Sequence, residues 1–333
     1  MMLSGDWSLL GEEGQQLMDG AFATGTMRNL RGQWLRFNTF CEYYNVPNPC
    51  PVTAQVLVRY IAWLCRSLRS QASVRNYVNG VKVLHLVYGL DLGGFSDAAV
   101  RLALRGVDRK LRYTPKRAQP ITAEVLVKML DGLDPNSPID ATYRALFLLS
   151  FFLFLRKSNT VPDSVKAFDP SKQLVRGDCR RAGGVLFVHS KWSKTNQFGR
   201  RSHAVPLLPL QGTPVCPVAA FERMCELVPG LDTDPAFFVI VGGVKKPVTY
   251  SMFQRRLKAS IQAIGLDSRL FSTHSFRRGG ATLAFKAGIS GDTIKVLGDW
   301  QSEAYQVYLE CPIEVKAAAS DLFRKAVLSR ISF

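Results

Sequence analysis

Apolar residues recur at helical spacing through the first part of the chain, which predicts a bundle of amphipathic helices. A first helix is predicted between residues 23 and 44, and three more follow. The expected N-terminal caps of these three are Thr53, Ser73 and Ser96. No alternating strand pattern occurs between residues 20 and 113, so the region is expected to be entirely helical.

The second part of the chain mixes helices with short β-rich runs. Thr122 is expected to cap a helix, and the apolar stretch after it predicts a buried helix over 138–155. Three strands of a small antiparallel sheet are predicted at Leu174–Arg176, Val185–His189 and His203–Leu207. Further helices are predicted over 215–228, 250–264, 274–287, 290–297 and about 312–330. The expected fold class is mainly α with a small antiparallel β-sheet.

Two weakly patterned segments set the predicted domain boundaries. Residues 1–20 are rich in glycine, so a flexible arm is expected there. The segment 114–121, TPKRAQPI, combines prolines with polar residues, which is typical of a linker. The chain is therefore divided into an arm, a helical domain over 21–113, this linker, and an α+β domain over 122–333.

The charge balance indicates the partner rather than the fold. The chain carries 43 basic and 26 acidic residues, a net charge of +17, with a pI near 9.8. This excess favours a polyanion, and double-stranded DNA before a membrane surface, because no basic amphipathic helix stands apart from the globular pattern. The longest apolar run, 145–155, is too short to cross a bilayer. The seven cysteines form no C-x-x-C pair, so free thiols in a reducing, intracellular compartment are expected.

One predicted helix carries a stripe of arginines that could contact a phosphate backbone. The stripe consists of Arg101, Arg105, Arg109 and Arg112, and the chain continues into Lys116 and Arg117. A charged stripe is often only a solvated helix face. Here Asp108 is its one acidic neighbour, which favours contact with DNA phosphates.

Residues 273–310 hold the candidate chemistry. A histidine and an arginine lie one helical turn apart, at His274 and Arg277, and a Gly-Asp-Trp turn places Trp300 before Tyr305 and Tyr308. No metal-ligand spacing is present. These residue types suit the binding of a phosphate and its attack by a phenol. Upstream, Arg156 follows the apolar helix 138–155, either as a simple C-terminal cation or as a guanidinium held ready for a phosphate.

Taken together, these motifs resemble the tyrosine recombinase (phage-integrase-like) family. The matching segments are FLFLRKSN with Arg156, WSKTNQFG with Lys194, HSFR with His274 and Arg277, LGDW with Trp300, and YQVY with Tyr308. They occur in the family's order and extend over the whole chain. The amino-acid sequences of these motifs are most similar to those of eukaryotic transposon recombinases of the DIRS, Ngaro and Crypton groups. The resemblance implies a core-binding domain over 21–113 and a catalytic domain over 122–333.

The resemblance also implies a role for each residue. Arg156 and Arg277 would clamp the phosphate, and Trp300 would donate its indole N–H to it. His274 would be the base for Tyr308, the nucleophile of a 3′-phosphotyrosine intermediate, and Lys194 would protonate the leaving 5′-oxygen. No metal, ATP or other cofactor would be needed. Further DNA contacts are expected at Lys191, Arg200, Arg201 and Arg278.

Several rivals remain open within this pattern. Tyr305 lies one turn before Tyr308, and Lys191 lies near Lys194 in the same predicted loop. His189 and His203 are expected to be surface or packed histidines beside the site. Two positions depart from the pattern of many members. Asp299 and Asn159 stand where a histidine and a glutamate are common; an aspartate at 299 would repel a phosphate.

The resemblance implies a mobile-element recombinase or integrase that acts in the nucleus. It would bind one DNA site as a homodimer and form a homotetramer in the synapse, with the helix at 312–330 either packing within its own chain or docking on a neighbouring protomer. Two alternative functions are an inactive, domesticated DNA-binding protein of the same fold and a relaxing enzyme of the type IB topoisomerase kind.

Overall fold

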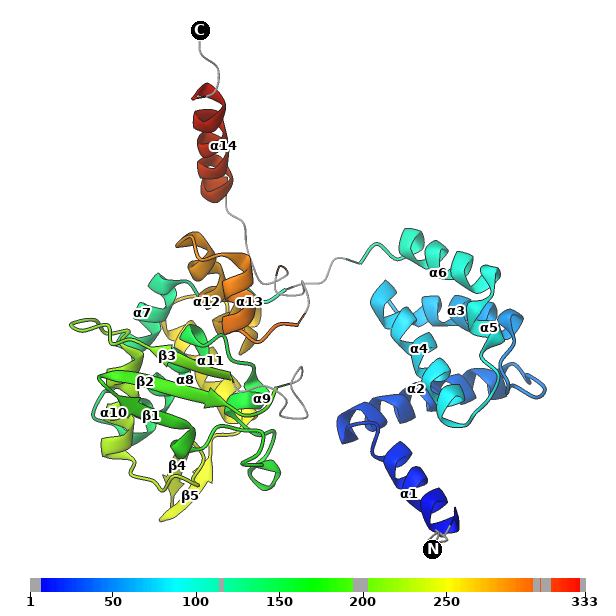
Figure 1. Ribbon diagram of the computed structural model, residues 1–333, viewed down its shortest axis with the longest axis horizontal. Helices are drawn as coiled ribbons and strands as arrows, with labels where there is room; N and C mark the ends of the chain where they lie inside the picture. The colour runs from blue at the N-terminus through cyan, green and yellow to red at the C-terminus, as the bar shows by residue number, and fades with distance from the viewer. Residues whose placement is uncertain (1–6, 114–116, 194–202, 302–305, 307–312, 330–333) are drawn as a thin grey trace, which may run out of the picture. The chain divides into compact units, whose positions relative to one another are not determined.

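The computed structural model describes residues 7–113, 117–193, 203–301, 306 and 313–329, and the chain divides into two compact units (Figure 1). The first unit is Met1–Lys116 and the second is Arg117–Phe333. Their boundary falls inside the segment 114–121.

The described part of the first unit is helical throughout. Its helices are α1 Trp7–Asp19, α2 Thr24–Tyr43, α3 Ala54–Ser67, α4 Gln71–Val87, α5 Gly93–Ser96 and α6 Ala98–Lys110. Phe37, Leu57 and Tyr60 are completely buried at its centre, with ring pairs such as Phe37–Tyr60 at 5.0 Å between centroids. His85 is buried beside them, accepting from the Val52 amide at 3.0 Å and donating to the Val81 carbonyl at 2.9 Å. Aromatic packing between helices therefore holds this unit together.

The expected helix starts in this unit were partly wrong. Thr53 does cap α3, accepting a hydrogen bond from the Val56 amide at 3.3 Å. Ser73 lies within α4, and α6 is capped by Asp97 because Ser96 ends the short helix α5. Residues 7–19, expected in a flexible arm, form helix α1, which includes Gly11 and Gly14, two of the four glycines of residues 1–20.

The second unit is built around α8, Pro138–Phe152, most of whose residues are buried. The other helices are α7 Ala123–Asp131, α9 Lys157–Thr160, α10 Pro217–Leu227, α11 Tyr250–Ala263, α12 His274–Lys286, α13 Gly291–Leu297 and α14 Ile313–Leu328. Thr122 caps α7 as predicted, accepting from the Val125 amide at 3.3 Å. The helix predicted to reach residue 155 ends at Phe152, because Phe154 adopts a left-handed conformation with φ of 49°.

One three-stranded antiparallel sheet covers α8 (Figure 1). Its strands are β1 Cys179–Ala182, β2 Val185–Ser190 and β3 His203–Leu207. Alternate residues such as Leu186 and Val188 face the core while Phe187 is exposed, as a half-buried strand requires. At one end of the sheet Ser190 pairs with His203, so the β2–β3 connection starts and ends at this edge.

One strand prediction was wrong, and one sheet was missed. Leu174–Arg176 is not a strand: Val175 forms one isolated bridge to Pro235, and the chain then turns into a 3₁₀ helix over Arg176–Asp178. A second sheet, β4 Phe238–Val241 with β5 Val244–Pro247, was not predicted.

Two glycines let α12 lie directly on its neighbours. A Cβ atom on Gly279 would overlap the carbonyl oxygen of Ile121, and one on Gly280 would overlap that of Phe151, at the end of α8. Close packing is therefore the role of the Gly279-Gly280 pair in this structure. It brings the start of α12, with His274 and Arg277, against the segment that carries Arg156.

No helix among the described residues is long and apolar enough to span a bilayer. The described residues contain no cluster of three or more metal-ligating side chains. The six cysteines among them are free thiols.

Candidate active site

Arg277 is the most buried charged side chain of the candidate site, with 1% of its surface exposed. It lies in the first turn of α12. Its guanidinium donates to the carbonyl of Phe154 and, at 2.8 Å, to that of Gly298. These two carbonyl oxygens fix the position of the guanidinium. A buried cation held in this way strongly favours an anion beside it.

Arg156 approaches the same place from a different part of the chain. It was expected at the C-terminal end of the long apolar helix. Instead it follows the left-handed turn at Phe154 and precedes α9. Its side chain is half-buried and donates a long hydrogen bond of 3.5 Å to the carbonyl of Asp299. Arg156 and Arg277 thus bind the carbonyls of two consecutive residues, Gly298 and Asp299.

The ring of Trp300 packs against the guanidinium of Arg277. It follows Asp299, whose φ of 50° turns the chain after α13, and it is 5% exposed. The guanidinium carbon of Arg277 lies 3.6 Å from the centroid of the Trp300 ring, and Phe154 packs against the same ring at 6.2 Å. The structure therefore gives Trp300 a stacking role. Donation from its indole N–H to a phosphate stays a prediction.

His274 begins α12, and its side chain reaches solvent. Desolvation by the surrounding protein, followed by the positive charges of Arg277, Arg156 and Lys157, lowers the pKa of His274 below its usual value. The lowered pKa favours the neutral imidazole, which is the form that can accept a proton. The imidazole of His274 therefore lies within the electrostatic influence of both arginines.

The chain is similar to a known recombinase in sequence and to others in fold. No protein-family model matches the chain. The chain is 25% identical over 286 residues to an integrase/recombinase XerD homolog of Selenomonas ruminantium, a match that covers 82% of this chain and 77% of the relative. That match supports the tyrosine recombinase/integrase family.

Solved structures show the same fold. A XerH site-specific recombinase bound to difH substrate in a pre-cleavage complex has a TM-score of 0.55 and 15% identity, covering 89% of this chain and 79% of that one. The Tn1549 transposon integrase in complex with transposon right end DNA has a TM-score of 0.54 and 14% identity, covering 93% and 96%. The predicted fold class, mainly α with small antiparallel sheets, is confirmed as a tyrosine recombinase fold.

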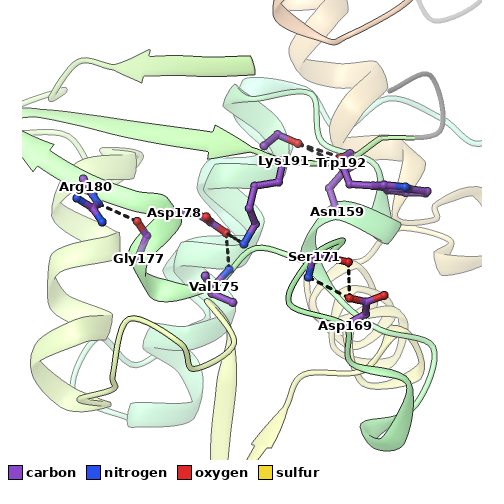
Figure 2. Close-up of polar contacts among 10 residues, drawn as sticks. Asn159, Asp169, Ser171, Val175, Gly177, Asp178, Arg180, Lys191 and Trp192 are labelled. Carbon is purple, nitrogen blue, oxygen red and sulfur yellow. Dashed lines mark hydrogen bonds and ion pairs between the residues drawn. The ribbon is translucent and has the colours of Figure 1, made fainter. Parts of the chain in front are cut away.

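Lys191, which rivals Lys194 in the tyrosine recombinase pattern, is held by an acidic partner. Its ammonium lies 2.8 Å from Asp178 Oδ2, which also accepts a hydrogen bond from the Val175 amide at 2.9 Å (Figure 2). The Asp178 side chain is only 9% exposed. Figure 2 shows the lysine side chain directed along the sheet edge toward this carboxylate. The structure thus pairs Lys191 with Asp178, and its roles as proton donor and as DNA contact stay predictions.

Four polar residues hold the two described ends of the β2–β3 connection beside the site. They are Asn159, Ser193, Asp299 and His203. Asn159 Nδ2 donates to the Trp192 carbonyl and, at 3.3 Å, to Ser190 Oγ. Ser193 Oγ donates to the carboxylate of Asp299, so this acidic group is directed at the loop. His203 contacts the Leu297 carbonyl at 3.1 Å and is half-buried, while His189 on β2 is also half-buried. The sequence pattern marked Asn159 and Asp299 only as departures and gave no signal for Ser193.

The remaining predicted DNA contacts differ in their surroundings. Arg101, Arg105 and Arg109 are exposed on α6, and Arg112 and Arg117 are exposed beyond it. Arg278 is half-buried and donates to the Ala118 carbonyl at 3.0 Å, which ties the chain entering α7 to α12. The other predicted site residues lie outside the described part of the structure: Lys116, Lys194, Arg200, Arg201, Tyr305 and Tyr308.

Proposed function

We propose that this chain is a site-specific DNA recombinase that cleaves and rejoins strands through a 3′-phosphotyrosine. One observation carries the proposal. The guanidinium groups of Arg156 and Arg277, far apart in sequence, are held on two consecutive carbonyls near the imidazole of His274, whose pKa they lower. Two fixed cations and a base around one point are what phosphodiester attack requires.

In the proposed reaction, the two guanidinium groups bind the nonbridging oxygens of the scissile phosphate. His274 accepts the phenolic proton of Tyr308, whose pKa is ordinarily about 10. The phenolate oxygen bonds to phosphorus, and the bond from phosphorus to the 5′-oxygen breaks. A proton from Lys194 converts that oxygen to a 5′-hydroxyl. Attack by another 5′-hydroxyl on the phosphotyrosine reverses these steps and joins the strands.

The proposed setting follows from the relatives and the charge. The XerH and Tn1549 integrase structures are DNA complexes, and the net charge of +17 favours DNA as the partner of this chain. We propose action on double-stranded DNA as a homodimer on each site and a homotetramer in the synapse. The sequences of the motifs favour a mobile element of the DIRS, Ngaro or Crypton type. A eukaryotic enzyme of this kind would act in the nucleus.

The test is capture of the covalent intermediate. A nicked duplex that releases a short 5′-hydroxyl fragment after cleavage should trap the protein as an adduct resistant to SDS. The wild-type chain and the Tyr305→Phe variant are expected to form the adduct, and Tyr308→Phe none. An adduct that forms with Tyr308→Phe but not with Tyr305→Phe would show that Tyr305, and not Tyr308, is the nucleophile. Strong binding without any adduct on any duplex would overturn the proposal.

A further inference from the structure

A pocket of about 660 Å³ lies at the C-terminal end of α2. It is lined by the end of α2, the loop that follows it and one face of α3, and we call it the α2–α3 pocket. Phe40, Val46, Pro47, Val56 and Trp63 form its apolar wall, and the Phe40 and Trp63 ring centroids are 5.6 Å apart. The lining residues all belong to the first unit, so the pocket is separate from the candidate active site. Concave apolar surfaces of this size commonly bind another molecule.

Two arginines give the α2–α3 pocket a positive charge. Arg59 and Arg66 lie two turns apart on one face of α3, with Trp63 between them. The guanidinium of Arg66 donates to the hydroxyl of Tyr44 at 3.1 Å, which holds it beside the pocket. Arg59 is exposed and forms no hydrogen bond or ion pair with a residue that the structure describes. No acidic residue is among the described residues of the lining, so the pocket favours a partner with acidic and apolar side chains.

Helix α1 has the complementary character. It carries Glu12, Glu13 and Asp19 and no lysine or arginine, in a chain whose net charge is +17. Both glutamates are exposed, and neither forms a hydrogen bond or ion pair with a described residue. The side chains of Leu17 and Met18 are 78% and 59% exposed, so the helices of the first unit leave them uncovered. Leu17 lies one turn after Glu13, which places an apolar and an acidic side chain on the same side of α1.

A second exposed helix, α14, matches the pocket less well. Its Leu322 and Phe323 are each 73% exposed. Asp321, however, is already paired within α14, at 2.7 Å to Arg324 and at 2.9 Å to Lys325. This acidic group is therefore occupied by cations of its own helix, whereas the glutamates of α1 are available to the arginines of the pocket.

The short connection between α1 and α2 requires that α1 come from a second copy of the chain. The amides of Gly20 and Ala21 are hydrogen-bonded back to carbonyls of α1, at 3.0 and 3.1 Å. Helix α2 begins at Thr24 and has 20 residues, so it is about 30 Å long, and the pocket lies at its other end. Glu13 lies only about 9 Å from the end of α1. The helix therefore cannot bring its glutamates to the pocket of its own chain.

We propose that α1 of one copy docks in the α2–α3 pocket of a second copy. The glutamates of α1 face the two arginines of the pocket, and its exposed leucine and methionine cover the apolar wall. Removal of this apolar surface from water drives the association, and the opposite charges select the partner and its orientation. The inference does not rest on the proposed function, because it concerns association of the protein in the absence of DNA.

The test exchanges the charges of the two surfaces and measures association of the full chain, without DNA, by sedimentation velocity. The pocket variant carries Arg59→Glu and Arg66→Glu, and the helix variant carries Glu12→Arg and Glu13→Arg. Each alone should self-associate at least about tenfold more weakly than the wild type, because like charges then face one another. An equimolar mixture of the two variants should associate as tightly as the wild type, because every contact again joins opposite charges. Rescue in the mixture also shows that both variants are folded.

A matched control separates docking from net charge. Arg269→Glu with Lys246→Glu makes the same change in net charge as the pocket variant, on exposed residues of the second unit. This control should associate like the wild type. Weakening equal to that of the pocket variant would overturn the inference.

A further pair of variants tests the apolar part of the contact. Leu17→Gln with Met18→Gln should weaken self-association by at least about tenfold through the loss of buried apolar surface. Leu322→Gln with Phe323→Gln changes exposed apolar side chains of α14 and should have no effect. If only the α14 pair weakens association, α14 is the contact and the inference fails.

Two other outcomes would overturn the inference and leave the proposed function in place. A wild-type chain that stays monomeric would show that α1 has no site on a second copy. A mixture of the pocket and helix variants that fails to associate would show that these charges do not meet across two copies. Association as expected, without a covalent adduct on any DNA, would instead overturn the proposed function alone.

Discussion

The guanidinium of Arg277 lies over the ring of Trp300, with its carbon 3.6 Å from the ring centroid. The tryptophan covers one face of the guanidinium while the Phe154 and Gly298 carbonyls hold its edge. A planar cation fixed on three sides keeps its orientation before any phosphate arrives, which is the preorganisation that electrostatic catalysis needs. The ring at position 300 therefore matters to this chain first as a support for Arg277.

Replacing Trp300 should separate this support from its other effects. Trp300→Ala removes a nearly buried ring and should lower the free energy of unfolding by about 3–5 kcal/mol. Trp300→Phe keeps an aromatic face for Arg277 and should cost less than half as much. Thermal or urea unfolding of the full chain, followed by near-UV circular dichroism, gives the comparison. Equal losses in the two variants would show that stacking on Arg277 contributes little to stability.

The contact of α12 with its neighbours depends on glycine. In Gly280→Ala the new methyl group would overlap the Phe151 carbonyl, and moving backbone there should cost at least about 2 kcal/mol of stability. Gly106→Ala is the matched control, because a Cβ at this α6 position meets nothing within 4 Å. It should be neutral or stabilise by up to about 1 kcal/mol through helix propensity. Similar melting temperatures for the two variants would contradict the packing argument.

Helices were predictable from the sequence because period and capping side chains are encoded locally, as Thr53 and Thr122 show. The β4–β5 hairpin was missed although Gly242-Gly243, at φ of 59° and 76°, directly follows the apolar run of β4 and is a usable turn signal. The site was predictable as a set of residue types. The hydrogen bonds that hold the site together were not predictable, because backbone carbonyls such as those of Leu297 and Gly298 have no sequence signature. Only the folded turn shows that they gather Arg277 and His203.

The two lysines beside the sheet edge should behave differently. Lys191 is paired with Asp178 at 2.8 Å, so Lys191→Ala should change the cleavage rate less than tenfold. Lys194→Ala should reduce it by about 10²- to 10⁴-fold, the usual contribution of a general acid. Single-turnover cleavage of a duplex by both variants provides the comparison. A larger loss of cleavage rate in Lys191→Ala than in Lys194→Ala would show that Lys191 is the proton donor.

Arg101, Arg105 and Arg109 on α6 should set part of the salt dependence of DNA binding. Each phosphate contact contributes about 0.9 to the slope of log affinity against log salt, so Arg105→Ala should make the slope shallower by about that amount. Arg269→Ala is a control with the same change in net charge, because Arg269 is exposed and already paired with Asp267 at 2.9 Å. Fluorescence anisotropy between 50 and 200 mM salt would measure both. Equal slopes in the two variants would show that α6 does not contact the phosphate backbone of DNA.

The lowered pKa of His274 predicts how the free protein responds to pH. Desolvation and the charges of Arg277, Arg156 and Lys157 disfavour the imidazolium, so the folded chain binds this proton less readily than the unfolded chain. Stability should therefore decrease as pH falls through the ordinary histidine pKa of about 6.5, where the unfolded state takes up the proton first. His274→Gln should remove that contribution.

A phosphate in the site should reverse part of this shift. Its negative charge offsets the two arginines, so the pKa of His274 should rise when a duplex binds, and binding should take up protons at pH values below the ordinary histidine pKa of about 6.5. NMR titration of the imidazole with and without DNA, assigned through His274→Gln, measures both values directly. Arg277→Ala offers the internal check, because loss of a neighbouring cation should raise the pKa in the free protein. A His274 that titrates at the same pH with and without DNA would place the scissile phosphate away from it, and the general base would have to be sought elsewhere.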